Sequence, residues 1–186
     1  GEICSGSPNV YHARPRICVS LPMSKSPNAL VWLLLSAFII IADQTSKLAI
    51  LERFQLHDTY AVVDGLLNLT LVYNEGAAFS FLSDAGGWQR WFFTIIASVV
   101  SVLLVVWLAR TPRNDLRTAL PLALILGGAV GNLIDRMRFG HVVDFIDVHY
   151  GSWSFPAFNV ADSGVSVGAV LLIAFSFFGA RAGTRP

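Results

Sequence analysis

One apolar run of the chain reads Ala119-Leu-Pro-Leu-Ala-Leu-Ile-Leu-Gly-Gly-Ala-Val-Gly-Asn-Leu-Ile-Asp-Arg-Met-Arg-Phe139. A bilayer hydrocarbon core of about 30 Å takes roughly 20 helical residues to cross, and this run has that length. Its final turns carry Asn132, Asp135 and Arg136, although polar and charged groups at membrane depth are expensive. The run therefore predicts a transmembrane helix with a functional cluster at one end.

Three further apolar stretches of similar length cover about residues 29–48, 88–108 and 158–180. Hydrophobic residues make up 54% of the chain and charged residues only 13%, about half the usual share of a soluble domain. A cleaved signal peptide is a rival interpretation of the first stretch, but a polar run, Asp43-Gln-Thr-Ser-Lys47, follows it instead of a small-x-small cleavage site. We expect an all-α membrane protein with four transmembrane helices.

Lysine and arginine residues in the helix flanks indicate the orientation. Without the two arginines of the N-terminal segment, six lie on the side of the chain termini and five on the other side. Ten of the twelve acidic residues lie on that other side. We expect both termini in the cytoplasm and the acidic side outside.

The chain divides into two tails and one membrane domain. Residues 1–28 contain several prolines and no apolar periodicity, which predicts a disordered N-terminal tail. Residues 1–22 are either a native extension or a segment that precedes a natural start at Met23. Residues 29–180 form the four-helix domain, and residues 181–186 form a cytoplasmic C-terminal tail.

Two loops on the outer side differ in character. Residues 49–87 contain two runs rich in β-branched and aromatic residues, 58–64 and 67–73, joined at the turn signal Asp64-Gly65. They predict a small outer-face, periplasmic β-sheet. Residues 140–155 are expected to form a loop whose aromatic side chains, Tyr150 and Trp153, suit the membrane interface.

Three polar clusters are predicted at outer helix ends. Asn132, Asp135 and Arg136 are spaced i, i+3 and i+4 and share one helix face, where Asp135 and Arg136 could simply pair. Asp144 stands among branched apolar residues and could be an ordinary interfacial acid. Asp162 lies in the first turn of the fourth helix, where free amides favour an anion and where capping is the alternative role.

Glycines spaced four apart predict how these clusters meet. Gly127 and Gly131 give the third helix a small-xxx-small face, and Gly164 and Gly168 give the fourth helix another. Close packing of these two helices would bring Asp162 towards the loop that carries Asp144. Two neighbouring carboxylates share a proton, so one can take a proton from water while the other protonates a leaving group. That chemistry is typical of an aspartic peptidase.

Other chemistries find less support in the sequence. Both cysteines, Cys4 and Cys18, precede the first apolar stretch, which excludes a cysteine nucleophile within the membrane domain. No His-Glu-x-x-His zinc motif and no Gly-x-Ser-x-Gly elbow occur. The net charge of +1 argues against a nucleic-acid partner.

Five ordered blocks resemble the bacterial lipoprotein signal peptidase, or signal peptidase II, family, and the resemblance covers about residues 32–170. The blocks are Asp43-Gln-Thr-Ser-Lys47, Tyr73-Asn-Glu-Gly-Ala-Ala-Phe79, Gly127-Gly-Ala-Val-Gly-Asn-Leu-Ile-Asp-Arg136, Val142-Val-Asp-Phe145 and Phe158-Asn-Val-Ala-Asp162. By position, the resemblance implies a catalytic pair at Asp144 and Asp162. It implies substrate-binding or supporting roles for Asn74, Asn132, Asp135, Arg136 and Asn159, and a structural polar role for Asp43.

The resemblance also implies an activity and a location. Members are four-helix aspartic endopeptidases of the bacterial inner membrane that remove a signal peptide directly before a diacylglyceryl-modified cysteine. The resemblance leads us to expect lipid-modified prolipoproteins as substrates, contact with membrane phospholipid and inhibition by globomycin-type peptide antibiotics. We expect no metal or other cofactor, and a monomer.

Two other classes of protein remain to be weighed against this hypothesis. A small transporter would more typically show inverted repeats and helices broken in mid-membrane. A structural four-helix scaffold would not need acids in three clusters at one side. Composition alone does not separate a peptidase from a transporter.

Overall fold

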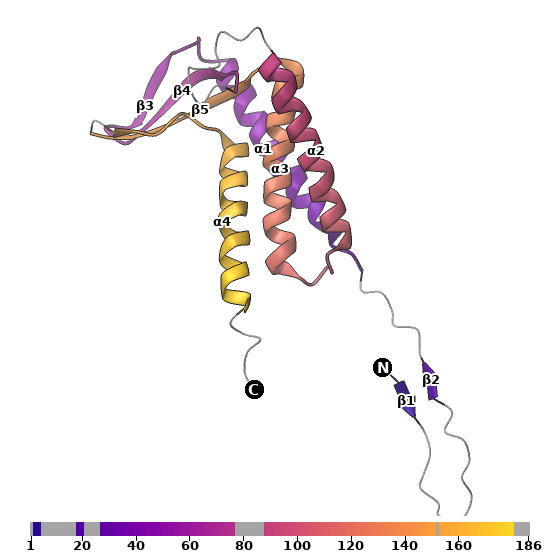
Figure 1. Ribbon diagram of the computed structural model, residues 1–186. Helices are drawn as coiled ribbons and strands as arrows, with labels where there is room; N and C mark the ends of the chain where they lie inside the picture. The colour runs from indigo at the N-terminus through magenta and orange to yellow at the C-terminus, as the bar shows by residue number, and fades with distance from the viewer. Residues whose placement is uncertain (1, 5–17, 21–26, 77–87, 152, 181–186) are drawn as a thin grey trace, which may run out of the picture.

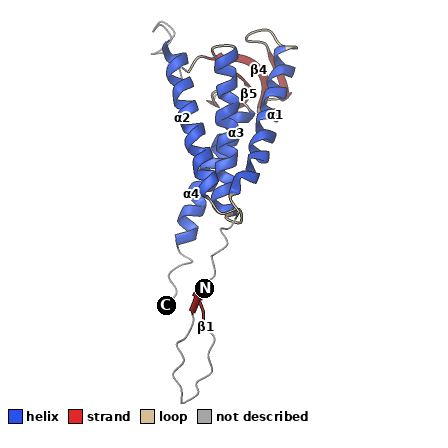
Figure 2. Ribbon diagram, turned by 90° about the vertical axis from the view of Figure 1, so that its right-hand side faces the viewer, coloured by secondary structure: helices blue, strands red, loops and turns tan. Residues whose placement is uncertain are grey.

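The computed structural model describes residues 2–4, 18–20, 27–76, 88–151 and 153–180. Within these residues, four helices are long and apolar enough to cross a membrane, and they lie side by side as a bundle (Figures 1 and 2). The predicted four-helix membrane fold is confirmed. The helices are α1 Leu33–Leu51, which follows the short 3-10 helix η1 Ala29–Trp32, then α2 Trp88–Arg110, α3 Leu116–Arg138 and α4 Val160–Ala180.

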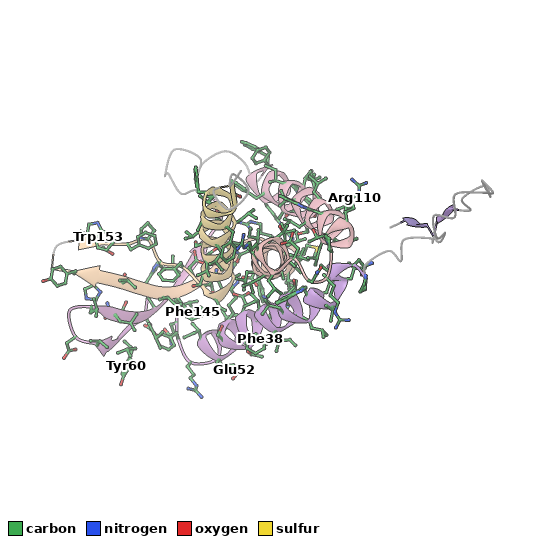
Figure 3. All side chains as sticks on the ribbon, turned by 90° about the horizontal axis from the view of Figure 1, so that it is seen from below. Phe38, Glu52, Tyr60, Arg110, Phe145 and Trp153 are labelled. Carbon is green, nitrogen blue, oxygen red and sulfur yellow. The ribbon has the colours of Figure 1, made fainter. Side chains whose placement is uncertain are left out.

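The outward faces of the bundle are covered with large apolar side chains. Leu34 and Phe38 on α1 and Phe177 on α4 are each exposed by 65% or more. An apolar surface of this extent suits hydrocarbon and not water. α3 differs from the other helices because it packs against all three, and in Figure 3 it lies at the centre of the bundle.

Glycines on α3 allow its close contacts, but they divide between two neighbours. A Cβ atom on Gly128 would meet the carbonyl oxygen of Ala161 on α4. A Cβ on Gly127 would instead lie 2.8 Å from Cβ of Ile39 on α1, and one on Gly131 would lie 2.8 Å from a carboxylate oxygen of Asp43. Gly127 and Gly131 therefore form a small-xxx-small face, as predicted, but it lies mainly against α1. A Cβ on Gly131 would also lie 3.2 Å from that of Ala161, and Gly128 makes the closer contact with α4.

The glycines of α4 do face α3 as predicted. A Cβ on Gly164 would lie 3.3 Å from the carbonyl oxygen of Leu124, and one on Gly168 would lie 2.8 Å from that of Pro121. The two helices therefore run close along several turns, and the first turn of α4 lies against the part of α3 that holds Gly128.

A four-stranded antiparallel sheet lies at one end of the bundle and projects beyond α4 (Figure 1). Its strands are β3 Thr59–Val63, β4 Leu67–Asn74, β5 Val142–Tyr150 and β6 Trp153–Ser154, in the order β3-β4-β5-β6. The predicted hairpin is present, and Gly65 takes the positive φ of 74° that its turn needs. Residues 140–155 were predicted to be a loop, and this was wrong, because they supply β5 and β6.

The sheet is joined to the bundle at its inner end. Leu71, Val143 and Phe145 pack with Ile50 near the end of α1. The segment before α4 also pairs with β5, because the Phe158 carbonyl accepts hydrogen bonds from the amides of Phe145 and Ile146 at 3.1 and 2.8 Å. The far end carries exposed aromatic side chains such as Tyr60 and Trp153 (Figure 3).

The terminal segments are described only in part. β1 Glu2–Cys4 pairs antiparallel with β2 Cys18–Ser20, in a region that the sequence predicts to be disordered. Pro27 and Asn28 belong to the same predicted tail, yet they pair with the turn between α2 and α3. The remainder of the predicted tail, residues 77–87 of the outer loop and residues 181–186 lie outside the described residues.

We expect Gly128→Ala to destabilise the bundle, because its new methyl group would press against the backbone of α4. Overpacking of this kind costs about 1–3 kcal/mol. Thermal unfolding of the purified protein in detergent measures the effect. Val170→Ala, at a side chain 66% exposed on α4, is the matched control and should unfold near the wild-type temperature. Equal unfolding temperatures for Gly128→Ala and wild type would contradict the close contact of α3 and α4.

Candidate active site

Asp144 lies in β5 with its side chain almost fully buried. One carboxylate oxygen accepts a hydrogen bond from Asn74 Nδ2 at 3.0 Å, and the other accepts one from Asn159 Nδ2 at 2.7 Å. Asn74 ends β4 opposite Val142, two residues from Asp144 along β5 and so on the same face of the sheet. The pairing of β4 with β5 therefore brings Asn74 to Asp144.

Asp162 lies in the first turn of α4 and closes a reciprocal cap. The Asp162 amide donates to Asn159 Oδ1 at 2.8 Å, and the Asn159 amide donates to Asp162 Oδ2 at 3.3 Å. This arrangement is a capping box, with the N-cap and N3 residues each satisfying a free amide of the other. Asp162 therefore does take part in a helix cap, as the alternative role for this residue required. The cap uses only one of its two carboxylate oxygens, Oδ2.

The second oxygen of Asp162 connects the two aspartates through asparagines. Asn132 Nδ2 on α3 donates to Asp162 Oδ1 at 2.7 Å. Asn159 Nδ2 lies 3.2 Å from Asn132 Oδ1 while it also donates to Asp144. Asp144 and Asp162, which are separate in the chain, are therefore brought into one hydrogen-bonded network by Asn159 and Asn132.

Asp135 has a different partner from the one considered in the sequence. Its carboxylate lies 2.7 Å from Lys47 Nζ on α1, and Lys47 also contacts Asp43 at 2.8 Å. Among the residues that the structure describes, no carboxylate lies within ion-pair distance of Arg136. The suggested Asp135–Arg136 pair is therefore absent from this part of the chain, and Lys47 takes the place of Arg136.

Arg136 is half-buried beside this network. Its guanidinium lies 5.5 Å from the ring centroid of Phe93 on α2, a cation–π distance. Its Nη1 lies 3.4 Å from the backbone carbonyl of Asn132, and it is close enough to Asp162 and Asp144 for Coulombic attraction. Arg136 therefore lies next to the two aspartates, and no residue that the structure describes forms an ion pair with it.

Electrostatics distinguish the two aspartates. Burial raises the pKa of the Asp144 carboxyl to about 6; the Asp162 carboxylate acts in the same direction, and the hydrogen bonds from Asn74 and Asn159 oppose the rise. Asp162 is only partly buried and faces the free amides at the start of α4, which favour a negative charge. The raised pKa lets Asp144 keep a proton closer to neutral pH than an ordinary aspartate would.

Metal ligands do not gather in this region. Within the described ranges, no three or more histidine, cysteine, aspartate or glutamate side chains are arranged so that they could hold a metal ion. The polar groups of the site are satisfied by one another, and the only buried side-chain polar atom of the described residues without a partner is Thr94 Oγ1.

The sequence analysis missed one member of the site. Lys47 entered the sequence analysis only as the last residue of the polar run 43–47 and was given no role, yet it is 2% exposed and has three polar side-chain partners. The i,i+4 spacing of Asp43 and Lys47 was a usable signal for an ion pair on one face of the helix. No pattern in the neighbouring sequence could have predicted the ion pair of Lys47 with Asp135, which lies on another helix.

Comparison with known proteins identifies the family. The model of the signal peptidase II family matches residues 35–178. A lipoprotein signal peptidase of Xanthomonas oryzae pv. oryzae is 53% identical over 158 residues, which are 84% of this chain and 95% of that protein. One of Ectopseudomonas mendocina is 53% identical over 153 residues, which are 82% of this chain and 90% of that protein.

Solved structures agree with this result. Two structures described as bacterial membrane enzymes superpose with TM-scores of 0.71 and 0.74 at 34% and 31% identity. The first comparison covers 82% of this chain and 96% of the other, and the second covers 89% and 98%. The predicted resemblance is confirmed: the chain belongs to the signal peptidase II family and is a membrane-bound aspartic peptidase.

Proposed function

We propose that this enzyme removes signal peptides from lipoprotein precursors by cutting the bond directly before a diacylglyceryl-modified cysteine, with Asp144 and Asp162 as the catalytic pair. The observation that carries the proposal is the network in which Asn159 and Asn132 connect these two carboxylates. The names of the relatives support the substrate class. The apolar faces of the helices suit a substrate that stays in the bilayer.

The mechanism needs no atoms beyond water, substrate and the two aspartates. Ionised Asp162 takes a proton from a water molecule, and the water oxygen forms a bond to the carbonyl carbon of the peptide. Asp144 gives its proton to the carbonyl oxygen, which produces a tetrahedral diol. Asp162 then gives its proton to the leaving nitrogen, Asp144 recovers a proton from the diol, and the carbon–nitrogen bond breaks.

The side chains around the pair have supporting roles in this proposal. Asn159 and Asn132 hold the two carboxylates in place while protons move. Asn74 and Arg136 border Asp144 and Asp162, and we assign them to contacts with substrate, since an amide and a cation both suit peptide carbonyl groups. Globomycin-type peptide antibiotics are expected to compete for the same space, and the proposed active unit is a monomer.

The proposal also includes an orientation. The site and the sheet lie at one end of the helices, and the turn between α2 and α3 lies at the other (Figure 1). Flank charges favour the site end as the outer, periplasmic side of the inner membrane and both termini as cytoplasmic.

Asp144→Asn and Asp162→Asn should each abolish cleavage in the purified enzyme. Asparagine keeps the size and most hydrogen bonds of aspartate but cannot exchange the proton, and each acid–base group contributes roughly 10²–10⁴ in rate. Cleavage of a lipid-modified precursor, read as its loss of size, measures the effect. The double variant should be little worse than either single variant, because groups that act as a unit do not contribute additively.

Asp147→Asn is the matched control for this test. Asp147 lies three residues from Asp144 on the same strand. Its carboxylate accepts a hydrogen bond from Asn68 Nδ2 at 2.9 Å and has no part in the network of Asp144 and Asp162. This control should keep near-normal activity. Turnover by Asp144→Asn at a rate near that of Asp147→Asn would show that Asp144 is not catalytic.

The pH dependence of kcat/KM should show a descending limb near pH 6. The proposed mechanism needs a proton on Asp144; with its pKa raised to about 6, the proton is present below that pH and lost above it. Activity therefore falls as the pH rises through about 6. Asn74→Ala removes a hydrogen bond that favours the carboxylate, so its limb should move to higher pH. An identical limb in wild type and Asn74→Ala would contradict this assignment of the proton.

Reporter fusions test the orientation. A reporter after Asn114, in the turn between α2 and α3, should read cytoplasmic, and one after Tyr150, at the end of β5, should read periplasmic. The same orientation predicts a cytoplasmic reading after Arg185. A periplasmic reading at Asn114 would reverse the proposed orientation.

A further inference from the structure

Three ions are buried together next to the proposed catalytic pair. The side chains of Asp43, Lys47 and Asp135 are exposed by 0%, 2% and 1%. Lys47 Nζ lies 2.8 Å from Asp43 Oδ2 and 2.7 Å from Asp135 Oδ2, so one ammonium bridges two carboxylates from different helices. Buried ions carry a large desolvation cost, and apolar residues of similar size are often as stable in their place. Such a cluster therefore calls for a reason beyond stability.

The two acids of this cluster hold backbone on either side of the active site. Asp43 Oδ1 accepts a hydrogen bond from the Ala161 amide at 2.9 Å, and Ala161 is the residue directly before Asp162. Asp135 Oδ2 accepts one from the Val143 amide at 3.1 Å, and Val143 is the residue directly before Asp144. Each acid thus fixes the main chain at the neighbour of one catalytic aspartate.

Lys47 makes a third polar contact that reaches the pair itself. Its Nζ lies 3.1 Å from Asn132 Oδ1, and an ammonium can only donate a hydrogen bond. The oxygen of the Asn132 amide must therefore face Lys47, which turns its nitrogen towards Asp162 at 2.7 Å. A reversed amide would place oxygen against the Asp162 carboxylate and nitrogen against the ammonium, and both contacts would be repulsive.

Gln44 completes the cluster from α1. Its Nε2 donates to Asp135 Oδ1 at 2.8 Å and lies 3.2 Å from Asp43 Oδ2. Every oxygen of the two acids is therefore engaged, and three helices and β5 meet at this one point.

We propose that Asp43, Lys47 and Asp135 form a positioning triad, in which Lys47 sets the spacing of Asp144 and Asp162 and the direction of the Asn132 amide. This proposal rests on the catalytic pair proposed above. Lys47 is a positioning residue and not a catalytic one, because it reaches the reacting groups only through Asn132 and through the main chain held by the two acids.

The test compares Lys47→Met with Lys47→Met/Asp135→Asn. Methionine keeps the length of the side chain but removes the charge, which leaves two carboxylates facing each other in the single variant. The double variant removes one negative charge as well, and asparagine still offers an oxygen to the Val143 amide. Displacements of about 1 Å from productive geometry cost on the order of 10²-fold in rate. The single variant Asp135→Asn is the reference for the double variant. We expect the two to unfold at similar temperatures and to have KM values within about twofold of each other. The kcat of the double variant should be about 10- to 100-fold lower than that of Asp135→Asn.

A purely structural role for Lys47 makes the opposite prediction. In that case balancing the charge in the double variant would restore kcat together with stability, and this result would overturn the proposal. A loss confined to KM would overturn it too, as would failure of both variants to insert and purify, because a positioning residue is not needed for folding. Arg53→Met is the matched control, since it removes an exposed cation just beyond the same helix and should leave kcat unchanged.

A double-mutant cycle tests the route through Asn132. If Lys47 acts mainly by orienting that amide, Lys47→Met should lower kcat far less in an Asn132→Ala background than in wild type. If Lys47→Met lowered kcat by the same factor with and without Asn132→Ala, Lys47 would not act through the Asn132 amide. Asp144→Asn is assayed in parallel: activity in that variant refutes the catalytic pair, whereas normal kcat in the Lys47 variants beside an inactive Asp144→Asn refutes only the triad.

Discussion

The close contact between Gly128 of α3 and the backbone of Ala161 on α4 is the constraint on which the site depends. Any side chain at Gly128 would push the first turn of α4 away from α3. That turn carries Asp162, and its hydrogen bond to Asn132 spans only 2.7 Å between the two helices. The Ala161 amide reaches Asp43 from the same turn. The absence of a side chain at Gly128 therefore allows Asn132 and Asp43 to reach the first turn of α4.

Polar groups at the site satisfy one another almost completely. The asparagines give each aspartate a donor, the capping box satisfies the amides that open α4, and Lys47 lies between two acids. In a low-dielectric setting an unsatisfied member of such a network would be costly, which favours one arrangement over the alternatives. The same low dielectric strengthens the repulsion between neighbouring carboxylates, and the proposed mechanism therefore places one proton on the pair Asp144 and Asp162.

Much of the fold was predictable because hydrophobic length is a local signal. The four spans and the β3–β4 hairpin follow from runs of about 20 apolar residues and from a turn at Asp64-Gly65. β5 was missed because Asp144, Asp147 and His149 interrupt its apolar pattern, although valine, isoleucine and aromatic residues dominate it. The strand pairs with β4 across more than 60 residues of chain, and no local pattern reports such a partner.

In the site, too, local contacts were predictable from the sequence and contacts between distant segments were not. The Asn159-x-x-Asp162 spacing is that of a capping box, so the local geometry of Asp162 could be read directly. Gly127 and Gly128 are adjacent and face different helices, and composition does not say which one faces α4. Asp135 lies next to Arg136 in sequence but pairs with Lys47, because the arrangement of the helices, and not proximity along the chain, brings charges together.

The order in which the chain enters the membrane gives the Asp43–Lys47 pair a further consequence. Helices that emerge from the ribosome are inserted from the N-terminus onward, so α1 reaches the lipid well before the segments that hold Asp135 and Ala161 exist. Asp43 and Lys47 are one turn apart and 2.8 Å from each other, so each can screen its partner's charge while α1 has no neighbour. The residues they finally contact arrive up to 118 positions later. The nascent protein thus carries its own counter-ion into the bilayer, and the proposed catalytic pair is complete only when the last helix, which holds Asp162, has been delivered.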